Sequence, residues 1–155
     1  MGTIVLQLEP GKAPITTKNF LHLVDLGTYN DATFYRTVLK KTEPQSNIEV
    51  IQGGLHDHPS PVTIPLETTL KTGLHNVNGE ISMARTSDPN SGSSEFFLCV
   101  GDNTFLDAQS QPDRNGYAAF GHVIRGMDVV RKINNAPANV ETLAPPVKII
   151  RMRRL

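Results

Sequence analysis

Two polar side chains near one another in the sequence are suited to act on a peptide. Arg36 lies in the run 33–38, where strand alternation predicts that Phe34 and Arg36 share a face. Gln52 ends a second run, in which Val50 and Gln52 share a face. A guanidinium is permanently charged and offers several fixed donors, and an amide can anchor a peptide backbone. Taken alone, Arg36 is better explained as a surface arginine, and Gln52 is explained equally well as an ordinary strand-end glutamine. The hypothesis therefore depends on their neighbours.

Aromatic and aliphatic residues further along the chain can supply an apolar pocket beside this pair. Alternation directs Phe96 into the core and leaves the adjacent Phe97 for a pocket. Phe105, Leu106 and Tyr117 flank a polar loop. Packing in a core or at the rim of a barrel explains each of these residues separately, and only their combination indicates a site.

A reaction that needs no nucleophile fits such a combination. Rotation about an X-Pro peptide bond has a barrier of about 18–20 kcal/mol, because the C–N bond has partial double-bond character. The trans form is favoured by only about 0.5–1 kcal/mol, so a catalyst must lower the barrier without favouring one isomer. The requirements are an apolar pocket for the proline ring, anchors for the flanking backbone, and a donor aimed at the twisted amide. Arg36 is the candidate donor.

Other chemistries find less support in the sequence. There is no G-x-S-x-G elbow, P-loop, G-x-G-x-x-G or H-E-x-x-H motif. Cys99 lies in an apolar run, which indicates a small buried hydrophobe rather than a nucleophile. His56 and His58 flank Asp57 and leave a zinc site open as an alternative. The basic run 151–154 is interpreted as the solvated end of a last strand.

Length, composition and charge indicate one neutral domain over residues 1–155. The 155 residues include 15 basic and 15 acidic side chains, so the chain lacks the electrostatic character of a nucleic-acid or anionic-membrane binder. Apolar runs are only a few residues long, and we expect neither a transmembrane helix nor a signal peptide. The compartment stays open: periplasmic if a leader has been removed, otherwise cytoplasmic.

Short apolar runs separated by turn residues predict a mainly β fold. Strands are expected at 3–8, 33–38, 48–52, 80–85, 95–100, 117–124 and 146–153, with a weaker one at 62–64. Helices are expected from Pro14 to Gly27 and from about Met127 to Asn134. Surface loops are expected at 39–47, 55–61 and 107–116. Without βαβ alternation, these elements favour a closed antiparallel barrel whose open ends are covered by the helices.

Taken in order, these residues resemble the cyclophilin family over nearly the whole chain. The segments that carry the resemblance are Gly2–Leu8, Ala13–Phe20, Phe34-Tyr35-Arg36, Gln52-Gly53-Gly54, Ile81–Ala84, Phe96-Phe97, Phe120-Gly121 and Gly126–Val130. The resemblance implies a closed eight-stranded antiparallel β-barrel capped by two α-helices. It also implies a peptidyl-prolyl cis-trans isomerase without cofactor or metal, acting on unfolded or flexible polypeptides. The Gly-Tyr-Ala-Ala-Phe-Gly context is similar to the bacterial branch.

The resemblance also implies individual roles. Arg36 corresponds to the catalytic donor and Gln52 to a backbone anchor. The residues implied to bind substrate are Phe97, Val50, Leu106, Tyr117 and Phe105 around the proline ring, with Ala84 and Asn90 along the groove for the preceding residues.

Several positions depart from the family pattern. Val50 stands where methionine is usual, and Glu49 where a pocket phenylalanine is usual. A carboxylate facing the pocket would compete for the Arg36 guanidinium, but alternation points Glu49 away from Val50. We therefore expect a shallower pocket, part of which Ile48 fills.

Two further departures concern ligand selection. Phe105 replaces a tryptophan that many members use to hydrogen-bond cyclosporin, and a phenyl ring has no N–H donor, so weak cyclosporin binding is expected. The loops 39–47 and 107–116 are enlarged and can frame a different substrate range. A binding module that holds proline peptides without catalysis remains an alternative, and we expect a monomer.

Overall fold

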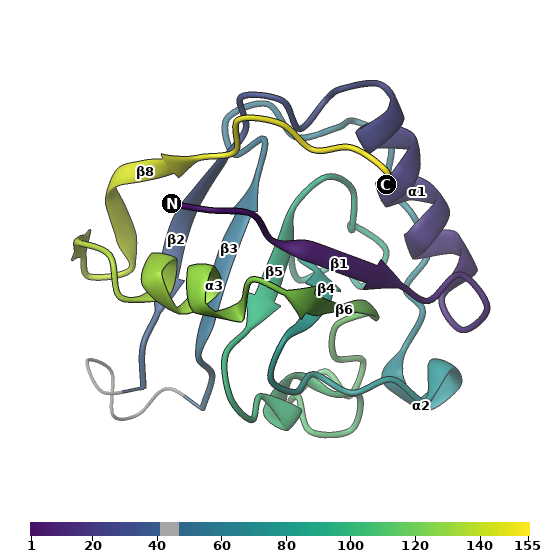
Figure 1. Cartoon of the computed structure of the whole chain (residues 1–155). Helices are drawn as coiled ribbons and strands as arrows, with labels where there is room; N and C mark the ends of the chain where they lie inside the picture. Colours follow the sequence, from purple (N-terminus) through teal and green to yellow (C-terminus); the bar gives the residue numbers. More distant parts are fainter. Residues whose placement is uncertain (41–46) are drawn as a thin grey trace.

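The structure is a computed structural model that describes residues 1–40 and 47–155 (Figure 1). Within these ranges the strands are β1 (Val5–Leu8), β2 (Thr33–Val38), β3 (Val50–Gly54), β4 (Glu80–Met83), β5 (Phe96–Cys99), β6 (Ala119–Arg125), β7 (Ala138–Asn139) and β8 (Thr142–Lys148). The helices are α1 (Pro14–Asp25), α2 (Thr69–Thr72), the 3₁₀ helix η1 (Thr104–Leu106) and α3 (Met127–Asn134). None of the helices in these ranges is long and apolar enough to cross a membrane.

All strands belong to one antiparallel sheet with the order β1-β6-β4-β5-β3-β2-β8-β7. The mainly β, eight-stranded antiparallel fold is therefore confirmed. Among the described residues the pairing order ends at β1 and at β7, so closure of the sheet into a barrel is not confirmed. Helices α1 and α3 agree with the predicted helices and lie at opposite sides of the molecule (Figure 1).

The sequence interpretation was wrong about the C-terminal strand and about residues 62–64. The last strand, β8, begins at Thr142 and ends at Lys148 rather than covering 146–153. It contains Pro145 and Pro146, which lie between its two stretches of pairing with β2. Because proline has no N–H to donate to a neighbouring strand, two prolines in a sequence argue against a strand. For this reason the sequence pattern did not indicate a strand at 142–148. The stretch 62–64 forms only an isolated bridge, from Ile64 to Gly92.

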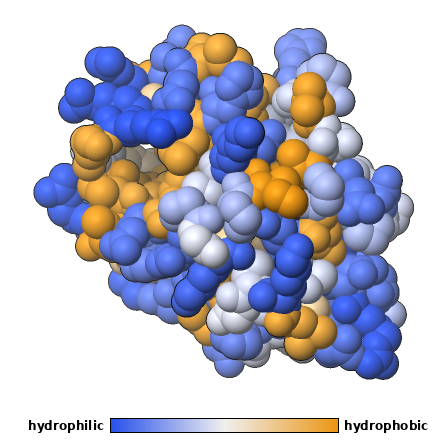
Figure 2. Space-filling view, turned by 90° about the vertical axis from the view of Figure 1, so that its right-hand side faces the viewer, coloured by the Kyte–Doolittle hydropathy of each residue, from blue (hydrophilic) through white to orange (hydrophobic). Residues whose placement is uncertain are grey.

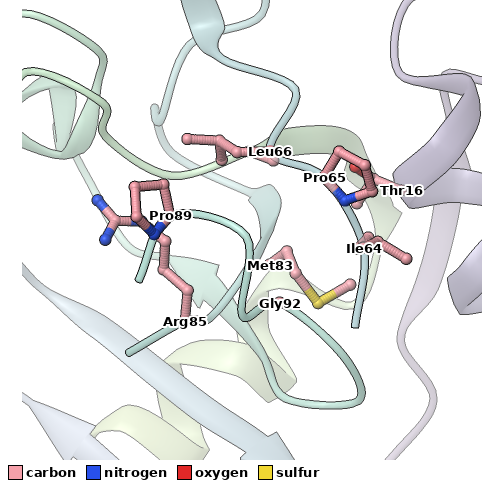
Figure 3. A pocket seen from close by; sticks show the side chains of 9 residues that line it. Thr16, Ile64, Pro65, Leu66, Met83, Arg85, Pro89 and Gly92 are labelled. Carbon is pink, nitrogen blue, oxygen red and sulfur yellow. The ribbon is translucent and has the colours of Figure 1, made fainter. Parts of the chain in front are cut away.

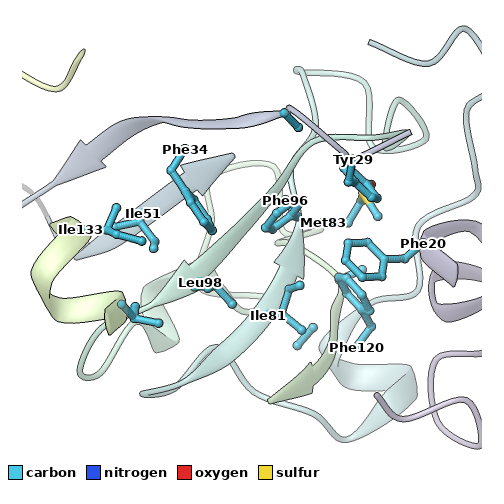
Figure 4. Close-up of a cluster of buried hydrophobic side chains, with 14 of the residues drawn as sticks. Phe20, Tyr29, Phe34, Ile51, Ile81, Met83, Phe96, Leu98, Phe120 and Ile133 are labelled. Carbon is cyan, nitrogen blue, oxygen red and sulfur yellow. The ribbon is translucent and has the colours of Figure 1, made fainter. Parts of the chain in front are cut away.

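The main core fills the space between one face of the sheet, α1 and α3. Phe96 lies near its centre and meets Phe20, Tyr29 and Phe34 edge-on, with ring centroids 5.5–5.8 Å apart (Figure 4). Such edge-to-face pairs stabilise the core beyond the contribution from burying the rings. Leu98, two residues further along β5, also belongs to this core.

A smaller apolar group, here called the outer cluster, gathers the side chains that alternate with those of the main core. On β5, Phe97 and Cys99 belong to the outer cluster, whereas Phe96 and Leu98 belong to the main core. The outer cluster consists of Val38, Val50, Phe97, Cys99 and Leu106, against which Ile48, Ala84 and Tyr117 pack. The strands β3 and β5 thus separate two apolar groups, and the prediction that Phe96 and Phe97 point in opposite directions is confirmed.

Helix α1 begins without a capping side chain of its own, because Ala13 precedes Pro14. The carboxylate of Glu67, only 2% exposed, takes over this task from a distant segment. It accepts hydrogen bonds from the Thr16 backbone N–H (2.8 Å), the Thr16 hydroxyl (2.7 Å) and the Ile15 N–H (3.2 Å). A negative charge at this end also complements the helix dipole. Glu67 therefore fastens α1 to the segment that precedes α2.

A second buried carboxyl, Glu80 on β4, makes the stability depend on pH. Burial, followed by the charge of Glu9, raises its pKa to about 7 against the opposing effects of Lys12 and His75. The folded state therefore keeps a proton that the unfolded state loses near pH 4.5. Stability falls as the pH rises from about 4.5 to 7 and then stays level.

Replacing Glu80 with glutamine removes this penalty while keeping the shape of the side chain. We expect the variant to match wild type at pH 4.5 and to exceed its unfolding free energy by on the order of 2 kcal/mol at pH 8. Urea unfolding at several pH values from 4.5 to 8 measures the difference. A difference that stays constant across this range would contradict the assignment.

Candidate functional site

A β-bulge in β2 sets the direction of Arg36. Phe34 pairs with Gly53, but Arg36 pairs with Gln52, so two steps along β2 match one step along β3. Phe34 thus points into the main core, whereas Arg36 lies on the opposite face with Gln52. The expectation that Phe34 and Arg36 share a face was wrong, because the extra residue reverses the alternation. Bulges commonly re-aim a side chain in this way next to functional sites.

The Arg36 guanidinium is held by two acceptors. Its Nη1 donates to Gln52 Oε1 at 3.0 Å, and its Nε donates to Glu141 Oε2 at 2.6 Å. The Nη2 atom lies 2.6 Å from the same Glu141 oxygen. Arg36 and Gln52, predicted as a pair, are therefore in direct contact, and the sequence reading did not find Glu141.

Tyr35 and Glu95 fix which way the Gln52 amide faces. The Tyr35 hydroxyl donates to Glu95 Oε2 at 2.7 Å, so its oxygen receives the Gln52 Nε2–H at 2.8 Å. Burial, and then the bond to Glu95, raise the pKa of Tyr35 well above its usual range and keep the phenol a donor. The Gln52 carbonyl must then face Arg36. Its second N–H is left available for a peptide carbonyl.

The outer cluster supplies the apolar surface beside these polar groups. Gln52 lies opposite Phe97 in the β3–β5 ladder, and Val50 lies two residues from Gln52 on the same face. Leu106 reaches the cluster from η1. Phe97, Val50 and Leu106 are each less than 10% exposed, so they form a closed floor rather than a deep hole.

Tyr117 forms the wall of this surface and is positioned from both sides. Its ring meets Phe97 edge-on at a centroid distance of 5.6 Å, and the Arg85 guanidinium stacks on it at 4.6 Å. Its backbone N–H donates to Leu106 O at 3.0 Å. Gly116, with a φ of +66°, permits this approach, since a Cβ there would lie 2.7 Å from the same carbonyl oxygen.

Comparison with known proteins agrees with this arrangement. The family model described as "Cyclophilin type peptidyl-prolyl cis-trans isomerase/CLD" matches residues 1–154. The chain belongs to the cyclophilin family. A peptidyl-prolyl cis-trans isomerase of Acinetobacter baylyi is 40% identical over 97% of this chain and 79% of its own length. Peptidyl-prolyl cis-trans isomerase B of Escherichia coli is 37% identical over 85% of this chain and 78% of its own length.

A solved structure is similar in fold. A cyclophilin-type isomerase of Cryptosporidium parvum, crystallised in the presence of the dipeptide Ala-Pro, superimposes with a TM-score of 0.80. It covers 99% of this chain and 94% of its own, at 22% sequence identity. At this identity the likeness supports the cyclophilin fold alone.

Not every residue that the cyclophilin resemblance indicated joins the outer cluster. Ala84 packs against it, but Phe105 is 40% exposed on η1. Asn90 is exposed, and its side-chain oxygen accepts the Leu66 N–H at 2.9 Å. Ile48 packs against the cluster, as expected for a residue filling part of the pocket.

The enlarged loops are described only in part. The segment 41–46 of the predicted loop 39–47 lies outside the described residues. Loop 107–116 is present and is fastened by Arg85, which donates to Gly116 O at 2.8 Å and to Asp113 at 2.5 Å. Arg85 thus connects this loop to the wall residue Tyr117.

The metal alternative gains no support. Among residues 1–40 and 47–155, no group of three or more His, Cys, Asp or Glu side chains is arranged to hold a metal ion. His56 instead contacts Asp57 at 2.7 Å and meets the Tyr35 ring edge-on. Cys99 is buried, which raises its thiol pKa and agrees with the interpretation as a core residue.

A narrow pocket lies on the other side of Arg85 from the outer cluster's wall residue Tyr117. It holds about 210 Å³ of space, part of it open to solvent (Figure 3). Its lining residues are Thr16, Ile64, Pro65, Leu66, Met83, Arg85, Pro89, Gly92 and Ala118. None of these belongs to the outer cluster. Arg85, which lines this pocket, also stacks on the Tyr117 ring, so the pocket adjoins the candidate site at that wall.

Proposed function

We propose that this chain catalyses cis–trans isomerisation of X-Pro bonds in unfolded or flexible polypeptides at the face formed by Arg36, Gln52 and the outer cluster. The observation that carries the proposal is the contact of the Arg36 guanidinium with Gln52, which pairs with Phe97 on the neighbouring strand. The charged donor Arg36, the backbone anchor Gln52 and the apolar floor at Phe97 are therefore immediate neighbours. The membership of the cyclophilin family supports the same reaction.

Each group has a distinct part in the proposed reaction. The proline ring rests on Phe97, Val50 and Leu106, and this contact removes the ring from water. The free N–H of Gln52 holds a carbonyl of the flanking backbone. A free N–H of Arg36 then donates to the amide nitrogen, whose lone pair becomes available as the twisted bond loses resonance. Neither isomer is favoured by these contacts.

Two-dimensional exchange NMR on an Ala-Pro peptide tests the proposal. Catalytic amounts of the protein are expected to accelerate cis–trans exchange far beyond the uncatalysed rate of tens to hundreds of seconds. Shift changes in the peptide without faster exchange would favour the binding module instead. The absence of both effects, with several residues before proline, would contradict the proposed function.

Cyclosporin is expected to bind weakly because Phe105 offers an exposed ring without a donor. Replacing Phe105 with tryptophan should tighten binding roughly three- to tenfold, the value of one additional hydrogen bond. Isothermal titration calorimetry measures both constants. The variant Leu70→Trp adds an indole at another exposed position and serves as the control. Equal tightening by both substitutions, or by neither, would contradict the role of Phe105.

We further propose that residues 1–155 act as a single, monomeric domain. One sheet includes strands from Val5 to Lys148, and one main core joins it to α1 and α3. The face that carries α1 is largely hydrophilic, with apolar residues in smaller groups (Figure 2). Closure of the sheet into a barrel remains a prediction. Sedimentation equilibrium tests the monomer.

A further inference from the structure

The turn between β7 and β8 places a carboxylate beside the candidate catalytic arginine. Asn139 pairs with Thr142, so Val140 and Glu141 form the connection, and Val140 adopts a φ of +59°. A positive φ is uncommon for a β-branched residue, which makes this a specific turn rather than a generic one. The Glu141 carbonyl oxygen accepts the Thr37 backbone N–H at 2.8 Å. The turn is therefore fastened to β2 directly after Arg36.

The side chain of Glu141 completes the contact. Its Oε2 receives the Arg36 Nε–H at 2.6 Å and lies 2.6 Å from Nη2. The side chains of Arg36 and Glu141 are 38% and 27% exposed, so the pair is partly shielded from water. It differs in this from the pair between Asp31 and Lys148, the last residue of β8, whose side chains are 71% and 62% exposed.

The contacts with Glu141 and Gln52 determine which N–H groups of Arg36 remain available to a substrate. A guanidinium has five N–H groups. Glu141 occupies the Nε side, and Gln52 accepts one N–H of Nη1. The N–H groups that remain are on the two terminal nitrogens, Nη1 and Nη2. Glu141 thus leaves the end of the guanidinium for the substrate and fixes the direction in which it points.

We propose that Glu141 is a positioning residue that holds the Arg36 guanidinium in its catalytic orientation before the substrate arrives. This inference rests on the proposed function. A free arginine side chain loses rotamer freedom when it is ordered, and Glu141 orders it in advance. The carboxylate also lowers the positive potential at Arg36. Because Glu141 binds the Nε side and the pair is partly solvated, the gain in orientation exceeds this loss.

Two substitutions separate orientation from charge. Glu141→Ala removes the acceptor, and we expect kcat/KM to fall about tenfold, mainly through kcat. Glu141→Gln keeps an acceptor for the Nε–H and should retain most of the activity. Asp31→Ala, which breaks the exposed pair with Lys148, is the control and should leave kcat unchanged.

The NMR signal of the Arg36 Nε–H reports the positioning without requiring turnover. It should exchange slowly with water in wild type and in Glu141→Gln, and be lost or averaged in Glu141→Ala. An unchanged signal in Glu141→Ala would overturn the proposal even if kcat fell. Higher kcat in both Glu141 variants would identify a brake and also overturn it. If wild type shows no isomerase activity, the proposed function fails, and the Nε–H signal still decides whether Glu141 orders Arg36.

Discussion

The Arg36→Ala variant is expected to lose at least a hundredfold in kcat/KM for an Ala-Pro peptide while remaining folded. The guanidinium is the charged donor beside the outer cluster, and its contacts with Gln52 and Glu141 hold it near the surface rather than in the core. Losing a donor aimed at a developing charge typically costs about 10²–10³ in rate. Exchange NMR on the peptide measures the rate, and circular dichroism confirms the fold.

Two further variants test whether the planar guanidinium at position 36, rather than any positive charge, is required. Arg36→Lys keeps the charge but loses the planar set of donors, so its activity should lie between wild type and alanine. Arg125→Ala removes an exposed arginine at the end of β6 and should leave the rate unchanged. If the alanine variant at position 36 exchanged the peptide as fast as wild type, Arg36 would not be the donor.

Replacing Glu67 with alanine is expected to lower the free energy of unfolding by about 3 kcal/mol. The substitution leaves the buried Thr16 N–H and hydroxyl without their acceptor, and each unsatisfied buried donor costs about 1–3 kcal/mol. The N–H of the exposed Ile15 also loses its acceptor but can bond to water. It also removes the negative charge from the first turn of α1. Urea unfolding monitored by circular dichroism measures the loss.

Asp128→Ala is the matched control for Glu67→Ala. Asp128 also lies in the first turn of a helix, α3, but its contact with Lys132 is 3.5 Å long and both side chains are more than 60% exposed. Such a pair contributes only about 0.3–0.5 kcal/mol. Similar losses in the two variants would show that Glu67 acts only as an ordinary surface charge.

Periodicity predicts those parts of the site that lie on regular strands. Alternation alone distinguishes Phe96 from Phe97, and their places in the main core and the outer cluster confirm it. It also places Val50 and Gln52 on one face, as the structure does. These predictions succeed because the repeat of two residues holds wherever the ladder is regular.

The remaining parts depend on contacts between segments far apart in the sequence. Glu141 contacts Arg36 across 105 residues, and its turn gives no Gly or Asn-Gly signal that would mark a hairpin. The Tyr35 hydroxyl bonds to Glu95 across 60 residues, and no pattern in the sequence indicates this contact. A single sequence contains no information on such pairings, so the polar network became visible only in the folded chain.

The bulge in β2 makes the number of residues before Arg36 as important as their identity. Gly53 faces Phe34 so closely that a Cβ would lie 2.8 Å from the ring, so the position of Phe34 against β3 is fixed. Insertion of one residue between this anchor and Arg36, with the bulge retained, would place Arg36 opposite Ile51 and turn the guanidinium toward the main core. A permanently charged group cannot be buried there without a partner. Insertions in this short stretch are therefore constrained by folding as well as by catalysis.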